Sequence, residues 1–381
     1  MKILENLSKS IGAMRSANSA IISVENSAVR FYIPDKSKKD FSVQVETFKV
    51  HNFDDEFFET LQNVIKIHFS KKGAKAVLVL PDALFFTDTL KLPLVNKRVM
   101  NESIALAFNS LYKNYNDLKY NSFPVYRDKK NVVYSVVGIR KDILNKFISS
   151  ASLAGVNVVG VTSATSAMTN GAMMLNSKVK NDDCAVVDVK ESCSNLALVA
   201  KGKTVGYFTI PFGYETFLSD RIVREEEVLD HSSARLLVIN AQELAKRKRL
   251  TTAMKVEDET DTEDIADAKS AKKLRNLPKY LLRDMPDEEN KVIYENFRPI
   301  VKWTLEVIRE SFRADGFIDI ENVYFNLPSK FSFLPELANE EGGSKVKFLP
   351  LANATDKENI ITNLELYGAT AIGKYNRQNN F

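Results

Sequence analysis

Two stretches far apart in the chain begin with the same pattern of strand, tight turn and strand. In the first, AIISVENSAVRFYI at residues 20–33, apolar β-branched residues flank a polar break at Glu25-Asn26-Ser27. The second begins at Cys184 and continues CAVVDVKESCSNLALVAKGKTVGYFTIPFG. Such runs around polar turn residues predict β-hairpins. The repetition predicts an internal duplication into two lobes, with a cleft between them as a usual place for ligands.

Strands and helices alternate after the first hairpin. Alternating residues predict a strand at 41–50, and a short apolar run bounded by Pro81 predicts another at 75–81. Between them, apolar residues from Phe57 to His68 recur at helical spacing. A chain of 381 residues that is 44% hydrophobic can bury one large core or two cores of ordinary size. The sequence therefore predicts an α/β protein with two lobes.

Residues 84–161 carry their own set of elements between strands of the first lobe. We expect a strand at TDTLKLP, a helix at 96–112, a strand at VVYSVVGI, an amphipathic helix around Phe147, and VNVVGVT as a closing strand. A complete set of elements within another unit predicts an inserted subdomain.

The remaining segments differ in character. Residues 246–290 begin with KRKR and continue with the acidic VEDETDTEDIADA, which predicts a flexible excursion or solvated helices. The KRKR could contact anionic lipid or a motor protein, although a solvated helix end is the simpler interpretation.

Regular structure is expected again after the excursion, with a helix at 301–312, the strands IENVYFNLP and KVKFLPL on either side of a polar Gly342-Gly343 loop, and a closing helix near 358–374. Apolar residues at helical spacing from Ile3 to Met14 predict an amphipathic leader, which either lies on a membrane surface or packs on the body.

The expected organisation has eight parts. They are the leader (1–18), the first lobe (19–83), the insertion (84–161), a helix completing the first lobe (162–181), the second lobe (182–245), the charged excursion (246–290), the rest of the second lobe (291–357), and a closing helix with a polar tail (358–381).

Composition excludes several functional classes. A net charge of +4 gives no global field that would favour nucleic acid. Two cysteines, Cys184 and Cys193, are too few for a disulfide framework and suit a reducing compartment. No apolar run reaches about 18 residues, so we expect a cytoplasmic protein.

Familiar catalytic motifs are not found in the sequence. The three histidines have no cysteine or carboxylate at ligand spacing, so no metal site is expected. Neither G-x-S-x-G nor G-x-G-x-x-G occurs. Gly202-Lys203-Thr204 resembles the end of a P-loop, but Ala197 stands where its first glycine would be. Alternating residues on both sides instead predict a hairpin turn at Lys201-Gly202.

The order of these motifs resembles the PilM family, in the FtsA and PilM branch of the actin-like ATPase fold. DCAVVDVKESCSNLALVAKGKTVGYFTIPFG is similar to the family's second phosphate loop, with Asp188 at the aspartate place and Ser194 at the hydroxyl place. The first hairpin corresponds to D-I-G-S-S-S-V-K, which puts Ser27 in the first phosphate loop. VIRESFRADGFIDIENVYFNLP followed by LPEL resembles the adenosine-loop region, and residues 84–161 the extra subdomain. The resemblance implies duplicated ribonuclease H-like lobes with an insertion, and Asp188, Ser194 and Ser27 as vestigial nucleotide-binding residues.

Departures from the family pattern fall on the phosphate loops. Glycine is used there because the backbone amides must approach phosphate closely and because some residues of the loop need positive φ. This chain has Ser23 in place of an aspartate, Glu25 and Lys190 in place of glycines, and Asn195 in place of an acidic residue. The adenosine-loop glycines are replaced by Asn-Leu-Pro-Ser at 326–329. We expect no ATPase activity and no tightly bound cofactor, with weak ATP and magnesium binding, aided by Lys190, as the alternative.

The resemblance implies an adaptor of type IV pilus or related secretion assembly. Its partners would be the cytoplasmic N-terminal segment of a PilN-like inner-membrane protein and other pilus assembly proteins, with self-association and peripheral membrane contact as further options and no nucleic acid. The groove for that segment would lie between the first lobe and the insertion, and the protein would act at the cytoplasmic face of the inner membrane. An FtsA-like division scaffold that polymerises on the membrane is the alternative. A sugar kinase or chaperone ATPase would need the missing glycines.

Overall fold

The computed structural model describes the chain in segments. These are residues 19–24, 28–35, 40–47, 53–69, 73–111, 117–190, 193–219, 222, 287–315, 320–328, 331–342, 346–351 and 364–369. The expected leader, the charged excursion up to residue 286 and the tail beyond residue 369 lie outside them. No helix in these segments combines the length and the apolar character needed to cross a membrane.

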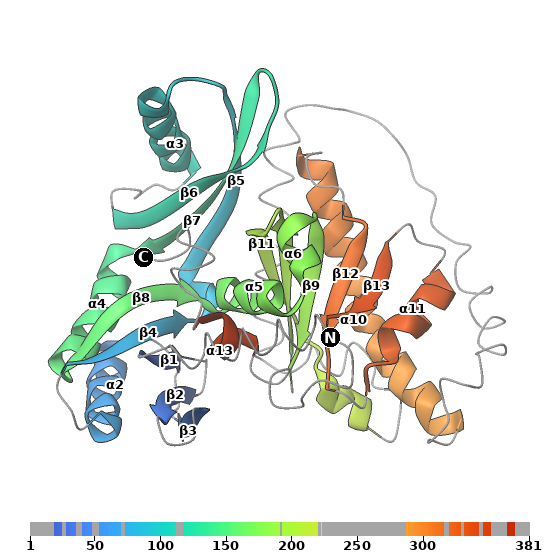
Figure 1. Ribbon diagram of the computed structural model, residues 1–381, viewed down its shortest axis with the longest axis horizontal. Helices are drawn as coiled ribbons and strands as arrows, with labels where there is room; N and C mark the ends of the chain where they lie inside the picture. Colours follow the sequence, from blue (N-terminus) through green and yellow to red (C-terminus); the bar gives the residue numbers. More distant parts are fainter. Residues whose placement is uncertain are drawn as a thin grey trace. The chain divides into compact units, whose positions relative to one another are not determined.

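The chain divides into two compact units. Unit 1 contains residues 1–182, 199–207 and 363–381, and unit 2 contains residues 183–198 and 208–362. The chain forms two five-stranded sheets (Figure 1): the first lies in unit 1, and the second lies in unit 2 except for residues 199–207, which belong to unit 1.

The sheet of unit 1 has the strand order β3-β2-β1-β4-β8. Its strands are β1 (Ala20–Val24), β2 (Ala28–Asp35), β3 (Asp40–Thr47), β4 (Ala74–Leu80) and β8 (Val156–Ser163). Neighbours among β1, β2 and β3 are antiparallel, whereas β1 pairs in parallel with β4, and β4 with β8. The hairpin and the two following strands expected from the sequence are confirmed.

Helices cover both faces of this sheet. Successive side chains of its central strands point to opposite sides, so each face has an apolar core of its own. Ile22 and Leu78 belong to a core completed by α2 (Asp55–His68) and α4 (Lys141–Leu153). Ile21 and Val77 belong to a second core, completed by α5 (Ala164–Leu175) and the short helix α13 (Leu364–Ala369). The carboxylate of Asp54 caps α2 by accepting from the N–H of Phe57 at 3.0 Å.

A separate antiparallel sheet with the order β5-β7-β6 interrupts unit 1. Its elements are β5 (Phe85–Pro93), α3 (Lys97–Leu111), β6 (Leu118–Arg127) and β7 (Asn131–Arg140), preceded by a 3-10 turn, η1 (Asp82–Leu84). Met100 and Ile104 of α3 pack on Leu90 and Val136 of the sheet. The insertion therefore has a core of its own, although Phe123 and Ile139 also enter the core shared with α2 and α4.

Two features of the insertion differ from expectation. The expected insertion ran to residue 161, but α4 packs on the main sheet and β8 pairs with β4 within it. The extra sheet is therefore confined to β5, β6 and β7. The predicted boundary was wrong because alternation indicates that VNVVGVT is a strand but does not show which strand it pairs with. The sequence also gave no sign of β6, an edge strand that contains Pro124 and has a register shift between Pro124 and Tyr126.

The second sheet repeats the order of the first, as β11-β10-β9-β12-β13. Its strands are β9 (Cys184–Val189), β10 (Ser194–Ala200), β11 (Lys203–Ile210), β12 (Asn322–Asn326) and β13 (Lys347–Pro350). As in the first sheet, the opening strand of the hairpin pairs in parallel with the fourth strand, and the fourth with the fifth. The internal duplication expected from the two hairpins is confirmed.

Unit 2 is completed by η3 (Tyr214–Leu218), α10 (Asp287–Asp315) and α11 (Leu334–Gly342). A chain of edge-on aromatic contacts runs through its core, joining Phe217 to Phe297 and Phe331 with ring centroids 5.7 and 5.2 Å apart. Helix α10 is longer than the helix expected at 301–312, and Gly342 ends α11 instead of lying in a loop.

The turn between β10 and β11 has the predicted form. Lys201 and Gly202 have φ of 48° and 73°. Positive φ at both central residues is the geometry of a two-residue hairpin turn of type I′. The motif that resembled a P-loop is therefore a hairpin, as predicted, and it belongs to unit 1 together with α6 (Ser177–Asn181).

Candidate functional site

Asp188 and Ser194, the two site residues expected in the second phosphate loop, both lie in the interior of unit 2. Asp188 is 5% exposed, and its carboxylate accepts a hydrogen bond from the side-chain amide of Asn326 at 2.6 Å. The two residues are direct neighbours in the parallel pairing of β9 and β12. Ser194 is fully buried, and its hydroxyl donates to the carbonyl oxygen of Phe212 at 2.6 Å. Both polar groups therefore form internal contacts of the second sheet.

The loop between β9 and β10 is closed by its own backbone. The N–H of Lys190 donates to the carbonyl oxygen of Cys193 at 2.9 Å, and the Lys190 carbonyl accepts from the N–H of Tyr214 at 2.8 Å. Lys190 is not among the described residues with positive φ. A phosphate loop needs free backbone amides, often at positive φ, so the amide of Lys190 lacks that arrangement.

The first phosphate loop is described only at its edges. Ser23, at the place of the family aspartate, is 5% exposed and pairs across the hairpin with Arg30. Ser27 and Glu25 lie outside the described residues.

The region of the adenosine loop is occupied by large apolar side chains. Leu327 is 5% exposed and Phe331 is 1% exposed, and the N–H of Phe331 donates to the carbonyl oxygen of Pro328 at 2.8 Å. Phe331 also packs on Phe217 in the aromatic core. This segment therefore contributes to the core of unit 2. Residues 329 and 330 lie outside the described residues.

A chain of polar contacts in unit 1 was not expected from the sequence. The carboxylate of Asp82 accepts from the N–H of Thr165 at 3.0 and 3.2 Å and from its hydroxyl at 2.7 Å, at the first turn of α5. Burial, as the largest cause, raises the pKa of Asp82 to about 6, while its bonds to Thr165 oppose that rise. The only signal in the sequence was Pro81, which marks the end of a strand.

The same chain of contacts continues to the β10–β11 hairpin. The hydroxyl of Thr169 on α5 donates to the carbonyl oxygen of Thr165 at 2.9 Å. Thr204 on β11 donates to the Thr169 hydroxyl at 3.0 Å, and Ser135 on β7 donates to the Thr204 carbonyl at 3.2 Å. Each of these buried hydroxyls thus has a partner, as stable packing requires.

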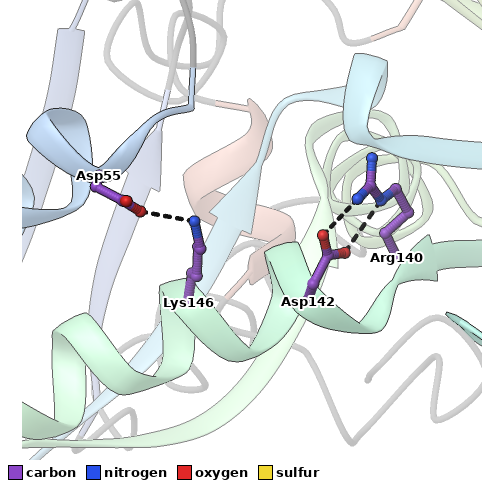
Figure 2. A network of polar contacts seen from close by, with 4 residues as sticks. All are labelled: Asp55, Arg140, Asp142 and Lys146. Atoms are coloured by element: carbon purple, nitrogen blue, oxygen red, sulfur yellow. Dashed lines mark hydrogen bonds and ion pairs between the residues drawn. The ribbon is translucent and has the colours of Figure 1, made fainter.

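Two ion pairs lie at the surface of unit 1, and one of them connects α2 and α4 (Figure 2). The ammonium of Lys146 lies 2.7 Å from a carboxylate oxygen of Asp55 and 5.6 Å from the ring centroid of Phe58. Arg140 and Asp142 form a second, bidentate pair at the start of α4. The Lys146 ammonium holds the pKa of Asp55 below its ordinary value, and Arg140 does the same for Asp142. Exposed pairs of this kind contribute little to stability and do not indicate a reaction centre.

The described residues offer no group of three or more histidine, cysteine or acidic side chains that could hold a metal ion. Cys184 is buried and Cys193 is partly buried, and the two are not joined in a disulfide.

Comparison with protein families finds no matching family, and comparison with curated proteins finds no relative. Among solved structures, the chain is similar to the PilM-PilN type IV pilus biogenesis complex. That match has a TM-score of 0.52 and 13% identity, and covers 95% of this chain and 98% of that chain. MreB 5 of Spiroplasma citri bound to AMPPNP matches at a TM-score of 0.40, with 12% identity over 95% of this chain and 98% of that chain. The ethanolamine utilization protein EutJ from Carboxydothermus hydrogenoformans matches at 0.37, with 10% identity over 92% and 88%.

The similarity to PilM extends over nearly all of both chains, and the resemblance expected from the sequence is confirmed at the level of the fold. Two sheets of the same strand order and an inserted three-stranded sheet agree with it. This chain has the actin-like ATPase fold, with duplicated lobes and an insertion of the FtsA and PilM type.

Proposed function

We propose that this protein is a cytoplasmic adaptor of type IV pilus or related secretion assembly, with a nucleotide site that no longer supports hydrolysis. Its partner would be the cytoplasmic N-terminal segment of a PilN-like protein, at the cytoplasmic face of the inner membrane. The similarity in fold to PilM, whose structure was solved as a PilM-PilN complex, supports this choice of partner.

The observation that carries the loss of hydrolysis is the state of the second phosphate loop. The Asp188 carboxylate is bonded to Asn326, the Ser194 hydroxyl to Phe212, and the Lys190 amide to Cys193. A phosphate with its magnesium ion would have to displace at least one of these internal bonds. Leaving a buried polar group unpaired costs about 1–3 kcal/mol. These residues therefore do not fit a nucleotide and its metal ion without rearrangement.

The insertion offers an apolar surface for the partner segment. It carries four exposed large apolar side chains, Leu94, Val95, Val99 and Leu106, of which Leu106 is 69% exposed. Val99 and Leu106 are seven residues apart and so lie on one face of α3, opposite to Met100 and Ile104 in the core. Exposed apolar side chains on one helix face can serve as contacts for an apolar segment of a partner.

The test is calorimetric titration of the purified protein with the N-terminal peptide of the PilN-like protein from the same genome and, separately, with ATP and magnesium. We expect peptide binding without ATP binding. Leu106→Asp should weaken peptide binding at least tenfold, because it puts a charge in an apolar contact.

Ile67→Asp is the matched control, since Ile67 is 73% exposed on α2, away from the insertion in sequence. It should leave peptide affinity unchanged. Equal loss in both variants would refute the insertion as the docking surface. ATP binding without peptide binding would favour an FtsA-like filament or an enzyme, and turnover of ATP would overturn the pseudo-ATPase proposal.

A further inference from the structure

Three lysines lie at or next to the turn of the β10–β11 hairpin. A Cβ atom placed on Gly202 would lie 3.0 Å from the carbonyl oxygen and 3.3 Å from the Cα atom of Lys180, so the turn rests against the end of α6. Lys201 and Lys203 flank Gly202 in the chain. The three side chains therefore start from backbone positions that are almost in contact. Lys180 and Lys201 are exposed, and Lys203 is partly buried.

Lys203 holds its positive charge in an unfavourable setting. Burial, followed by repulsion from Lys180, lowers the pKa of Lys203. Its ammonium lies 5.9 Å from the ring centroid of the buried Phe123 on β6. Both causes of the shift disfavour the ammonium form, so a bound anion would stabilise it.

Lys201 occupies a backbone conformation that lysine rarely adopts. Its φ is 48°, and it is the residue other than glycine with positive φ in the described part of the chain. The first central position of a type I′ turn favours asparagine, aspartate or glycine. The stability of the turn therefore does not explain why a lysine stands at this position. A function for its positive charge would explain it.

The net charge of this surface comes from the hairpin. Helix α6 and the two residues that follow it carry two lysines and two aspartates, which balance. Lys201 and Lys203 add two positive charges at the point where the turn meets α6. Such a compact arrangement suits an anion with several charges on one atom centre better than an acidic peptide, whose carboxylates are spread along a chain.

We propose that Lys180, Lys201 and Lys203 form a binding site for a phosphate group, separate from the vestigial nucleotide site in unit 2. Lysine serves as a point charge for phosphate, and three ammonium groups can contact its oxygens from different sides. The phosphate could belong to a soluble ion or to a lipid head group. This proposal does not depend on the adaptor function.

The test measures binding of inorganic phosphate and of pyrophosphate to the full chain by calorimetry. Sedimentation with vesicles of phosphatidylglycerol and phosphatidylcholine, against vesicles of phosphatidylcholine alone, tests the lipid source. Lys201→Asn is the decisive variant, because asparagine suits the turn while the ammonium is removed. We expect it to raise the melting temperature and to weaken phosphate binding at least fivefold, with Lys203→Gln and Lys180→Gln weakening it further.

Two controls separate this site from others. Lys190→Gln changes the vestigial phosphate loop and Lys66→Gln changes an exposed lysine of α2, and neither should alter binding. Binding to the acidic vesicles alone, lost in Lys201→Asn, would assign the phosphate to a lipid. Binding that Lys190→Gln abolishes and Lys201→Asn leaves intact would overturn the proposal, as would the absence of binding to phosphate, pyrophosphate and acidic vesicles.

Discussion

At the scale of single residues, Asp82 shows how a carboxylate can be held by a helix and yet keep a raised pKa. Its three bonds to Thr165 stabilise the ionised form, but burial outweighs them and raises the pKa to about 6. The ordinary pKa in the unfolded chain is 3.8. Between these two values the folded state holds a proton that the unfolded state has lost. The contribution of Asp82 to the free energy of unfolding is therefore fully present below pH 4 and is lost as the pH rises through 6.

Asp82→Asn should remove this pH dependence, because an amide does not titrate. Relative to the variant, the free energy of unfolding of the wild type should fall by about 2–3 kcal/mol between pH 4 and pH 7, at about 1.4 kcal/mol per pKa unit. Denaturant unfolding at several pH values measures the difference. Parallel profiles of wild type and variant would contradict the raised pKa.

Asp142→Asn provides a control of opposite sign. Arg140 lowers the pKa of Asp142, so its stabilisation is present above the ordinary pKa and is lost as the pH falls. Because both partners are about half exposed, with side-chain exposures of 51% and 59%, we expect an effect below about 1 kcal/mol.

At the scale of elements, the helices α5 and α13 approach each other through glycine. A Cβ atom on Gly368 would lie 1.7 Å from the carbonyl oxygen of Ala167, and one on Gly171 would lie 2.3 Å from that of Leu364. Both contacts are with backbone, which has no room to give way. The absence of side chains at these two positions therefore sets the distance between the helices.

Gly368→Ala should force α13 away from α5 and lower the free energy of unfolding by about 3 kcal/mol or more. Thermal unfolding followed by circular dichroism measures the loss. Glu365→Ala leaves an alanine at a partly exposed position of the same helix without adding an atom and should change stability by less than about 1 kcal/mol. An unchanged melting temperature in Gly368→Ala would mean that α13 does not pack against α5 in this way.

Local patterns predicted most of these elements but not their neighbours. Alternation and turn residues gave the two hairpins and the Lys201-Gly202 turn, because such features are encoded within a few residues. The sheet to which β8 belongs depends on pairing with β4, some 80 residues earlier, which no local period records. Strand β6 was missed for a related reason, since its proline is tolerated only because β6 lies at an edge.

The candidate site shows the same division. The sequence placed Asp188 and Ser194 at the start of the second hairpin, and the structure puts them on β9 and β10. Their partners, Asn326 and Phe212, were not predicted. Asn326 is 138 residues from Asp188, so only the parallel pairing of β9 and β12 brings the two together. A single sequence indicates which residues form a site more readily than it indicates the hydrogen bonds that those residues make.

At the scale of the whole molecule, the insertion begins and ends at neighbouring points. Phe85 at the start of β5 pairs with Ile139 near the end of β7, and Phe86 pairs with Gly138. The chain therefore leaves the first lobe and returns to it within the width of one strand pair. Helix α4 and strand β8, which follow, belong to the lobe itself.

Replacing residues 87–137 by an Asn-Gly turn should therefore leave a folded protein. We expect stability to drop by roughly 3–5 kcal/mol because Phe123 leaves the shared core, and peptide binding to be lost with Leu106. Deletion of residues 84–161 should instead give insoluble protein, since it removes β8 and α4. Soluble expression and circular dichroism compare the two, and cooperative unfolding of the longer deletion would contradict the assignment of β8 to the first lobe.

Helix α13 also bears on the order in which the protein is made. Leu366 and Ala369 cover a face of the first sheet to which Ile21 and Val77 contribute. On the ribosome, the strands of that face emerge before α5, which covers part of it, and α13, which covers another part, is synthesised only after both sheets are complete. The part of the face beneath α13 thus stays uncovered while unit 2 is synthesised, and exposed apolar surface of this kind favours aggregation.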